Sequence, residues 1–300
     1  MVVCQGTGKG LIRQREETVL YRCRIPRPPL DAFIELIWLY EDVTRPHALE
    51  RILPTGAAQI IVNLKEDRTR RYEPEANYRC DTLPGAVLAG AQSRYSVIDT
   101  AEQEYVMGVA FKPGGTVPFM RVPAHEMCDA DVPLDAIWDR HAASTLRERL
   151  LDADGADARL ETMELALLDA SRVWRPAVHH RAVTYALQMF QRRPLVTSVT
   201  SVTDAVGLSP KRFIERFKIE VGMTPKRYCR VRRFQRAVAR AHEGHRVDWV
   251  QLALDCGFSD QAHLIHEFRA FSGVTPTAYQ AARTEFRNHV KFLQDGDGGA

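Results

Sequence analysis

One short pattern occurs twice near the end of the chain, and it restricts the fold of this part more than any other feature. VGLSPKRFIERFKIEVGMTP begins at Val206, and CGFSDQAHLIHEFRAFSGVTP begins at Cys256. In both copies, Gly-x-Ser precedes a segment with apolar residues at helical spacing, and Gly-x-Thr-Pro follows it. Glycine allows the positive φ of a sharp helix exit, serine and threonine are good N-caps, and proline suits a first helical turn. The sequence therefore predicts a helix, a tight turn and a second helix, twice.

The two predicted motifs span residues 199–221 and 248–271. The first helix, Val199–Val206, is rich in β-branched residues that disfavour a helix, but Gly207 and the second copy of the pattern favour one. We expect Ser209 and Ser259 to cap the second helix of each motif, which we call the reader helix. Helical spacing places six side chains on the inner faces of the reader helices: Phe213, Phe217, Val221, Leu264, Phe268 and Phe271.

A long helix is predicted between the motifs, starting at Thr224 and Pro225. Its apolar residues recur at helical spacing, so one side can pack against both motifs. Four arginines lie on its other sides, where a solvated face is the plainer interpretation of each: Arg227, Arg230, Arg233 and Arg240. In a helix-turn-helix, the second helix enters the major groove of DNA, and two such contacts on one face of DNA are about 34 Å apart. The long helix would fix the separation of the two reader helices.

The charge of the chain is divided unevenly. The formal net charge is only +3, but residues 181–291 hold 19 Lys and Arg against 9 Asp and Glu. The remaining residues hold 22 basic and 29 acidic side chains. A polyanionic partner is therefore expected for the C-terminal part only.

The stretch from about Val199 to Tyr279 resembles the DNA-binding domain of the AraC/XylS family of transcription regulators. The resemblance depends on GLS and VGMTPKRY in the first motif, RVRRFQRA between the motifs, and CGFSDQAHL with FRAFSGVTPTAY in the second. It implies a sequence-specific DNA-binding transcription regulator that reads two successive major grooves, more often as an activator than as a repressor. The resemblance also suggests RNA polymerase as a partner and a homodimer as the assembly.

The resemblance also assigns roles to individual residues. Base contacts are expected from the early turns of the reader helices: Lys211, Arg212, Glu215, Gln261, His263 and His266. Phosphate contacts are expected from the helix starts and the linker: Ser209, Thr224, Lys226, Arg227, Ser259 and Thr275. Glu215 and Arg216 depart from the residues that the family often has there. For His263 the structural alternative is a packed histidine near the inner turn.

The fold class expected for the whole chain is α+β, with a β-rich N-terminal domain ahead of an all-α domain. Short runs rich in Val, Ile, Tyr and Phe, punctuated by Gly and Pro, predict strands from about residue 27 to 121. We expect one helix within them at Pro29–Tyr40, and further helices after Pro133. Four parts follow: a flexible arm (1–24), a β-rich domain ending in helices (25–175), the DNA-binding domain (176–293) and a disordered tail (294–300).

The N-terminal domain resembles the sensor-like, β-rich domains that precede this DNA-binding module in many bacterial proteins. Such domains generally bind an effector, dimerise, or both. Polar residues beside turns and strand ends are the candidate effector contacts: Arg51, Gln59, Asn63, Gln92 and Lys112. The structural alternative for each is the satisfaction of turn backbones. Two other functions stay open: a constitutive regulator without an effector, and a β-rich enzyme or redox sensor fused to a DNA-binding module.

Catalytic and metal-binding patterns are weak, and we expect no enzyme, no cofactor and no metal. The histidines before the basic part (47, 125, 141, 179 and 180) lack the clustered spacing of a metal site. HEMC at 125–128 has no second pair of ligands, and GTGKG at 6–10 lacks the spacing of a phosphate loop.

The cysteines and the hydropathy pattern indicate a reduced cytoplasmic protein. Six cysteines are scattered without framework spacing. Four of them (4, 23, 80 and 128) lie in the N-terminal part, where a redox sensor using two thiols is the alternative. No export signal is expected at the N-terminus, and the run DAFIELIWLYED is interrupted by Glu35, so no membrane span is expected.

Overall fold

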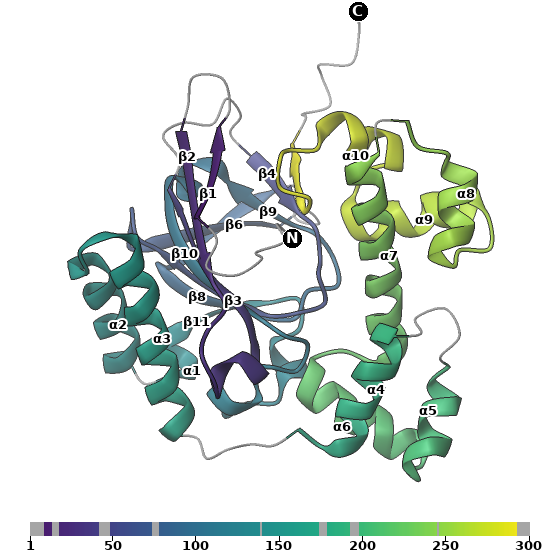
Figure 1. Cartoon of the computed structure of the whole chain (residues 1–300), viewed down its shortest axis with the longest axis horizontal. Helices are drawn as coiled ribbons and strands as arrows, with labels where there is room; N and C mark the ends of the chain where they lie inside the picture. Colours follow the sequence, from purple (N-terminus) through teal and green to yellow (C-terminus); the bar gives the residue numbers. More distant parts are fainter. Residues whose placement is uncertain are drawn as a thin grey trace, which may run out of the picture.

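The computed structural model describes residues 9–13, 18–41, 49–73, 78–138, 140–173, 179–192, 198–244 and 246–292. Within these ranges, two antiparallel sheets and three helices form the N-terminal part, and seven helices form most of the C-terminal part (Figure 1). The predicted α+β class, with the β-rich part first, is confirmed.

A seven-stranded antiparallel sheet forms the larger layer of the N-terminal part. Its strands, in sheet order, are β1 (Lys9–Arg13), β2 (Thr18–Arg24), β3 (Ile34–Glu41), β10 (Tyr105–Phe111), β5 (Gln59–Asn63), β8 (Ala86–Ala89) and β11 (Asp131–Pro133). Strands β5 and β10 alternate in the expected way, with Ile60, Val62, Met107 and Val109 on one face and completely buried.

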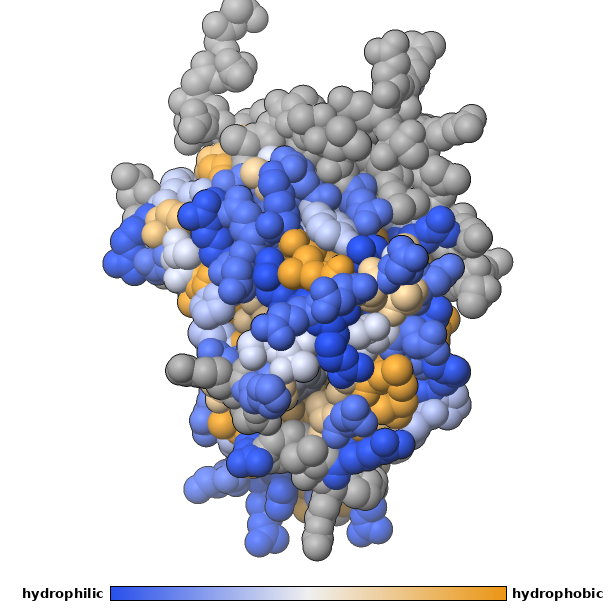
Figure 2. All heavy atoms as spheres, turned by 90° about the vertical axis from the view of Figure 1, so that its left-hand side faces the viewer, coloured by the Kyte–Doolittle hydropathy of each residue, from blue (hydrophilic) through white to orange (hydrophobic). Residues whose placement is uncertain are grey.

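Three helices cover that face of the sheet: α1 (Leu134–Ile137), α2 (Arg140–Asp152) and α3 (Gly155–Val173). Leu150 of α2 and Met163 of α3 are fully buried in the same core as the strand residues. Figure 2 looks onto this side of the molecule and shows a mostly hydrophilic surface with a few small apolar areas. The helices therefore bury their apolar stripes on the sheet and turn polar faces to solvent.

The second sheet joins the two ends of the chain. Its strands, in sheet order, are β12 (His289–Lys291), β4 (Leu49–Ile52), β9 (Ser96–Asp99), β6 (Arg68–Glu73) and β7 (Arg79–Pro84). Strand β12 follows the helical part in the sequence and pairs antiparallel with β4, which covers one side of β4 (Figure 1). The C-terminal part is thus fixed to the N-terminal sheet by backbone hydrogen bonds.

The C-terminal helices are arranged along one long helix, α7 (Pro225–Glu243). Figure 1 shows α4 (Arg181–Arg192), α5 (Val199–Val206) and α6 (Pro210–Val221) at one end of α7. At its other end lie α8 (Trp249–Cys256), α9 (Gln261–Ser272) and α10 (Pro276–Ala282). The predicted pair of helix-turn-helix motifs joined by a linker helix is confirmed.

The helix predicted at Pro29–Tyr40 is wrong. Residues Leu30–Ala32 form a short 3-10 helix, and Ile34–Glu41 form strand β3. This strand lies between β2 and β10 and is covered on both faces, because Ile37 packs in the core with the helices while Tyr40 packs against Phe286. A strand that is buried on both faces carries a continuous apolar run, and such a run also contains residues at helical spacing.

The flexible arm predicted for residues 1–24 is wrong where this segment is described, because β1 and β2 occupy residues 9–13 and 18–24. In β2, Cys23 is buried, and the ring of Tyr21 lies 6.0 Å from that of Phe286. On the other face, Arg24 pairs with Glu164 of α3. One charged residue of the predicted arm, Arg24, therefore binds a buried carboxylate. The predicted tail (294–300) and the break at Pro176 lie outside the described residues.

Candidate nucleic-acid interface

Both motifs turn at a glycine in the left-handed conformation, as the sequence predicts. Gly207 has a φ of 66° after α5, and Gly257 has a φ of 82° after α8. In the first motif, Ser209 caps α6 by accepting a hydrogen bond from the Arg212 N–H over 3.4 Å. These turns place each reader helix (α6 and α9) at an angle to the helix before it.

In the second motif the cap is Asp260, and the prediction that Ser259 caps α9 is wrong. Asp260 Oδ1 accepts a hydrogen bond from the His263 N–H over 2.7 Å. Ser259 instead interacts through Oγ with His263 Nδ1 over 3.0 Å. The turn after Gly257 is one residue longer than the turn after Gly207, which the shared Gly-x-Ser pattern conceals.

The closing Gly-x-Thr-Pro segments end the reader helices and start the next helices. Gly222 and Gly273 have φ values of 94° and 73°. Thr224 caps α7 by accepting from the Arg227 N–H over 3.2 Å, and Thr275 caps α10 by accepting from the Ala278 N–H over 3.1 Å. Counted back from the closing glycines, His263 corresponds to Arg212 and His266 corresponds to Glu215.

The predicted inner faces of the reader helices are confirmed. All six apolar residues are buried: Phe213, Phe217, Val221, Leu264, Phe268 and Phe271. The Phe217 ring lies 5.7 Å from Tyr228 of α7, and the Phe268 ring lies 5.1 Å from Phe234 of α7. Each reader helix is therefore anchored on α7, and its polar residues are exposed or half-buried except for Glu220, Glu267 and Ser272.

Five of the six predicted base-contacting side chains are exposed: Lys211, Arg212, Glu215, Gln261 and His266. The sixth, His263, is half-buried, and its ring meets the Phe258 ring edge-on at 5.4 Å. Together with the contact to Ser259, this packing supports a structural role for His263 in the turn. Whether each of these side chains contacts DNA stays a prediction.

A groove of about 420 Å³ lies beside α6. It is lined by His180, Leu208, Arg212, Glu215, Arg216 and Ile219. Sequence reasoning did not assign His180 or Arg216 to the interface. Arg216 is exposed on the same helix as Arg212, and helical spacing of four residues was the signal that could have found it.

The predicted phosphate-contacting residues gather at the ends of helices. Ser209, Lys226 and Ser259 are exposed, whereas Thr224 and Thr275 are half-buried and use Oγ for capping. Arg227, in the first turn of α7, is bound by the N-terminal part: its Nη2 lies 2.8 Å from Asp129 Oδ2. Asp129 is itself held by the N–H of Ser93 over 2.6 Å.

The solvated face considered for the arginines of α7 describes them only in part, because Arg227 and Arg240 are exposed but paired, while Arg230 and Arg233 are half-buried. Arg227 pairs with Asp129, and Arg240 pairs with Asp255 of α8. The Arg233 guanidinium lies 5.6 Å from the centre of the Phe258 ring. Arg230 donates to both carboxylate oxygens of Glu267 in α9, over 2.9 and 2.6 Å.

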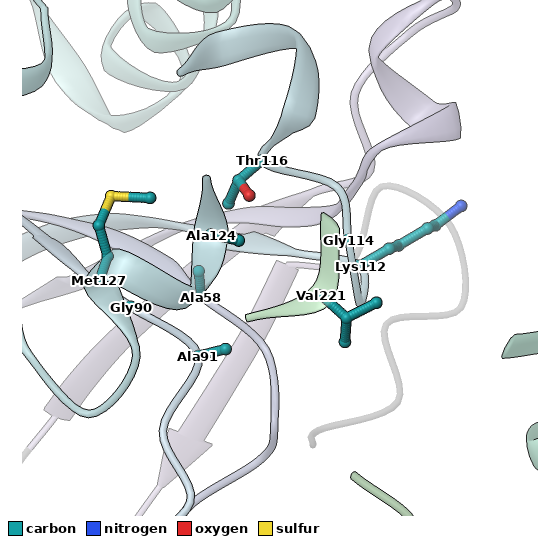
Figure 3. A pocket seen from close by; sticks show the side chains of 9 residues that line it. All are labelled: Ala58, Gly90, Ala91, Lys112, Gly114, Thr116, Ala124, Met127 and Val221. Carbon is teal, nitrogen blue, oxygen red and sulfur yellow. The ribbon is translucent and has the colours of Figure 1, made fainter. Parts of the chain in front are cut away.

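Close packing joins the N-terminal part to α6 and α7. A Cβ atom on Gly222 would lie 3.1 Å from the Ala91 side chain, and one on Gly56 would lie 3.3 Å from that of Val231. The cavity at this junction has a volume of only about 10 Å³, which is room for about one water molecule (Figure 3). In Figure 3 the Lys112 side chain points away from the other lining side chains.

Two polar contacts join the two parts of the chain, and one more lies beside them within the C-terminal part. Glu220 of α6 accepts a hydrogen bond from the His180 N–H over 3.2 Å and lies 3.1 Å from His179 Nδ1. Gln235 of α7 donates to the Pro54 carbonyl over 2.8 Å. His289 of β12 lies 2.7 Å from the completely buried Glu50.

The five candidate effector residues do not meet at one site in the structure. Arg51 lies in the second sheet, with its guanidinium 4.1 Å from the centre of the Phe292 ring. Gln59 is half-buried in β5, at the opposite end of that strand from Asn63. Asn63 accepts hydrogen bonds from the N–H groups of Lys65 and Glu66, and its Nδ2 donates to the Arg68 carbonyl.

The other two candidates have local partners. Gln92 donates to Asp131 over 3.3 Å, and Lys112 donates to the Asp31 carbonyl over 2.5 Å. Asn63 hydrogen-bonds backbone groups of the turn after β5, as the structural alternative expected. Effector binding by any of the five remains a prediction.

The cysteines differ in state. Cys23 is disulfide-bonded, so the expectation that all six are reduced is wrong at this position. Cys80, Cys128, Cys229 and Cys256 are free, and Cys4 lies outside the described residues. Burial, assisted by the Asp129 carboxylate, raises the pKa of the Cys128 thiol to about 11, which disfavours the reactive thiolate.

Metal-binding clusters and membrane-spanning helices are absent from the described residues. Among these residues, no group of three or more His, Cys, Asp or Glu side chains is placed to hold a metal ion. No helix in the described ranges has the length and apolar character needed to cross a membrane.

Comparison with known families finds one match in each part of the chain. Residues 202–282 match the family described as "Helix-turn-helix domain", and residues 23–133 match "Domain of unknown function (DUF6597)". A sequence search of curated proteins finds no match.

Solved structures resemble either the C-terminal part or most of the chain. An AraC-type regulator from Chromobacterium violaceum is 26% identical over 35% of this chain and 93% of that chain, with a TM-score of 0.32. The C-terminal domain of AraT, a response regulator from Geobacillus stearothermophilus, is 20% identical over 37% and 93%, with a TM-score of 0.34. ToxT from Vibrio cholerae is 9% identical over 89% and 98%, with a TM-score of 0.41.

These TM-scores are below 0.5, so the assignment depends on the family match, the paired motifs and the residues that form them. A double helix-turn-helix with glycine turns, Gly-x-Thr-Pro closures and a linker helix is the arrangement that the AraC/XylS resemblance implied. Residues 202–282 are therefore a helix-turn-helix domain with the paired arrangement of AraC-type DNA-binding transcription regulators.

Proposed function

We propose that this chain binds an asymmetric DNA site in a sequence-specific way, with α6 and α9 in two successive major grooves. The observation that supports this most strongly is the attachment of both reader helices to one long helix, α7. Helix α7 has 19 residues and is therefore about 28 Å long. Because both reader helices pack on this one helix, their separation is fixed, as two major-groove contacts about 34 Å apart on one face of DNA require.

The exposed side chains supply the required chemistry. Lys211 and Arg212 can donate to guanine, Glu215 can accept from cytosine, and Gln261 can form two hydrogen bonds with adenine. The surplus of basic residues over 181–291 supports phosphate neutralisation, with Lys226 and Arg227 near the start of the linker. His180 and Arg216, beside the groove of α6, are added to this set as phosphate contacts.

The role of the N-terminal domain is proposed on the family resemblance. It associates with a second copy or responds to a small-molecule effector, and the regulator then activates transcription with RNA polymerase, in the cytoplasm. The tight junction between the two parts supports transmission of a signal, because α6 and α7 contact the N-terminal part directly.

The constitutive alternative is favoured by one observation. The cavity at the junction of the two parts is too small for a metabolite, at about 10 Å³. A regulator without an effector would use its N-terminal domain for association alone.

Selection of DNA ligands tests the proposal. Purified full-length protein would be incubated with random duplexes, and enriched sequences would be measured against scrambled competitors at several salt concentrations. We expect two conserved blocks about one helical turn apart, bound about 10³-fold or more tightly than competitor. Equal affinity for enriched and scrambled duplexes would contradict sequence-specific binding. Thermal-shift screening with small metabolites would then distinguish the effector-dependent regulator from the constitutive one.

A further inference from the structure

Arg230 of the linker helix α7 and Glu267 of the second reader helix α9 form a bidentate ion pair. Arg230 Nε donates to Glu267 Oε2 over 2.9 Å, and Nη2 donates to Oε1 over 2.6 Å. The Glu267 side chain is only 6% exposed, and the Arg230 guanidinium also lies 5.4 Å from the centre of the Phe271 ring. The hydrogen bonds from Arg230 lower the pKa of Glu267, so the pair is charged.

The other contacts between α7 and α9 are less directional. Phe234 of α7 meets Phe268 and Phe271 of α9, with ring centres 5.1 Å apart in both cases. Aromatic packing holds two helices together but tolerates offsets between the rings. A planar guanidinium with two parallel hydrogen bonds restricts both distance and angle. The ion pair therefore fixes the rotation of α9 about its own axis more strongly than the rings do.

Rotation of α9 determines where its exposed side chains reach. Glu267 follows His266 directly, and His263 lies one turn before it. Because side chains extend about 5–6 Å from the axis of a helix, a rotation of about 10° moves them by about 1 Å. A displacement of that size is enough to break a hydrogen bond to a base edge.

The first motif lacks this pair. Counted from the closing glycines, Arg216 of α6 corresponds to Glu267, and it is exposed beside the groove. Helix α6 is held instead through Glu220, which accepts from the His180 N–H at the start of α4. The two reader helices thus have different polar anchors, and a change in one anchor can be assigned to one half of the DNA site.

We infer that Arg230 and Glu267 are positioning residues that set the base preference of the half-site read by α9. This inference rests on the proposed DNA-binding function. Neither side chain needs to contact a base, because the pair acts through the orientation of Gln261 and His266. Loss of the pair would leave binding to phosphates and to the α6 half-site in place.

The test compares DNA preference in the two half-sites separately, using full-length protein. Glu267→Gln keeps the shape of the side chain and removes its charge, and Arg230→Lys keeps the charge and removes the fork. Asp255→Asn is the matched control, because Asp255 joins α8 to Arg240 of the same linker helix at a more exposed position. For both test variants we expect preference within the α9 half-site to fall about tenfold, with the α6 half-site and the salt dependence unchanged.

Each outcome separates the inference from the proposed function. If the wild-type protein prefers no sequence, the proposed function fails. If the wild-type protein is specific and Arg230→Lys, folded by circular dichroism, keeps the wild-type preference in both half-sites, the positioning role is overturned. Equal losses in both half-sites would also overturn it, since they would indicate a general weakening of the domain. Selective loss in the α9 half-site, absent from Asp255→Asn, supports it.

Discussion

The ion pair between Asp129 and Arg227 yields a prediction about the affinity of the whole chain for DNA. Arg227 is expected to bind a phosphate, yet in the structure its guanidinium lies 2.8 Å from Asp129 Oδ2 in the N-terminal part. A phosphate and this carboxylate would compete for the same donors. Replacing Asp129 by Asn should therefore raise the affinity of the protein for DNA of any sequence.

The structure limits the magnitude of the effect. The Arg227 side chain is 46% exposed and the Asp129 side chain is 13% exposed, so solvent weakens the pair but does not abolish it. A pair of this kind contributes up to about 1 kcal/mol, which corresponds to about fivefold in a dissociation constant. Asn is the least disruptive replacement, because residue 129 has a φ of 57° and Asn tolerates the left-handed region.

Fluorescence anisotropy with a labelled duplex, measured over a range of salt concentrations, provides the assay. We expect Asp129→Asn to bind specific and scrambled duplexes about fivefold more tightly. The slope of log affinity against log salt should become steeper by about 0.9, since one more phosphate is neutralised. Arg227→Ala should weaken binding to both duplexes and make the slope shallower.

The matched control is Asp131→Asn, which removes the same charge nearby. Asp131 lies in β11, pairs with Arg71 and accepts a hydrogen bond from Gln92, and neither of these two partners is a predicted DNA contact. If Asp131→Asn raises the affinity as much as Asp129→Asn does, the effect comes from net charge and the competition between Asp129 and phosphate is refuted. An unchanged salt slope in Asp129→Asn would refute it as well.

Three further predictions concern base contacts, backbone strain and pH. Arg212→Ala and Gln261→Ala should each cost about 1–3 kcal/mol on the selected site and relax the preference at one position, measured by competition binding. Gly207→Ala, with open space around it, should lower the free energy of unfolding by about 1–2 kcal/mol, while Gly222→Ala should lower it further in denaturant titrations because its Cβ would also meet Ala91. Burial raises the pKa of Glu102 to about 7, so the folded state favours the protonated carboxyl group. The free energy of unfolding should therefore decrease as the pH rises from about 4.5 to about 7. Glu102→Gln should remove this pH dependence in thermal unfolding.

The C-terminal part was predictable from the sequence because its signals are local. Glycine exits and the Ser209 and Thr224 caps mark helix ends within a few residues, and six apolar positions define the inner faces. Even there, Gly-x-Ser suggested Ser259 as a cap, whereas Asp260 takes that place. Both residues are good caps, and only the position of the helix start in three dimensions decides between them.

The N-terminal part was less predictable because its stability depends on contacts between distant residues. Strand β3 is apolar on both faces, so its pattern did not separate strand from helix. Strand β12 pairs with β4, and more than 200 residues separate Glu50 from His289 in the sequence. No local sequence pattern predicts a pairing between strands so far apart in the chain.

The partners of the arginines of α7 could not be predicted from the sequence, for a related reason. The spacing of these arginines shows that they lie outside the apolar stripe of α7. It does not show which other elements pack around this helix. Arg230 and Arg240 find carboxylates on α9 and α8, and Arg227 finds one in the N-terminal part. A charged helix face is solvated only where no other element covers it.

The arrangement of contacts on α7 indicates how a change in the N-terminal part would reach DNA. Both reader helices are anchored on α7 through Tyr228 and Phe234, so their separation is fixed by a helix whose backbone hydrogen bonds would have to break for it to bend. Arg227, in contrast, is held by one partly exposed ion pair at the first turn. Breaking that pair is far less costly than moving a reader helix. A signal that displaces Asp129 would therefore alter phosphate binding, and with it overall affinity, while the spacing of the two half-sites stays the same.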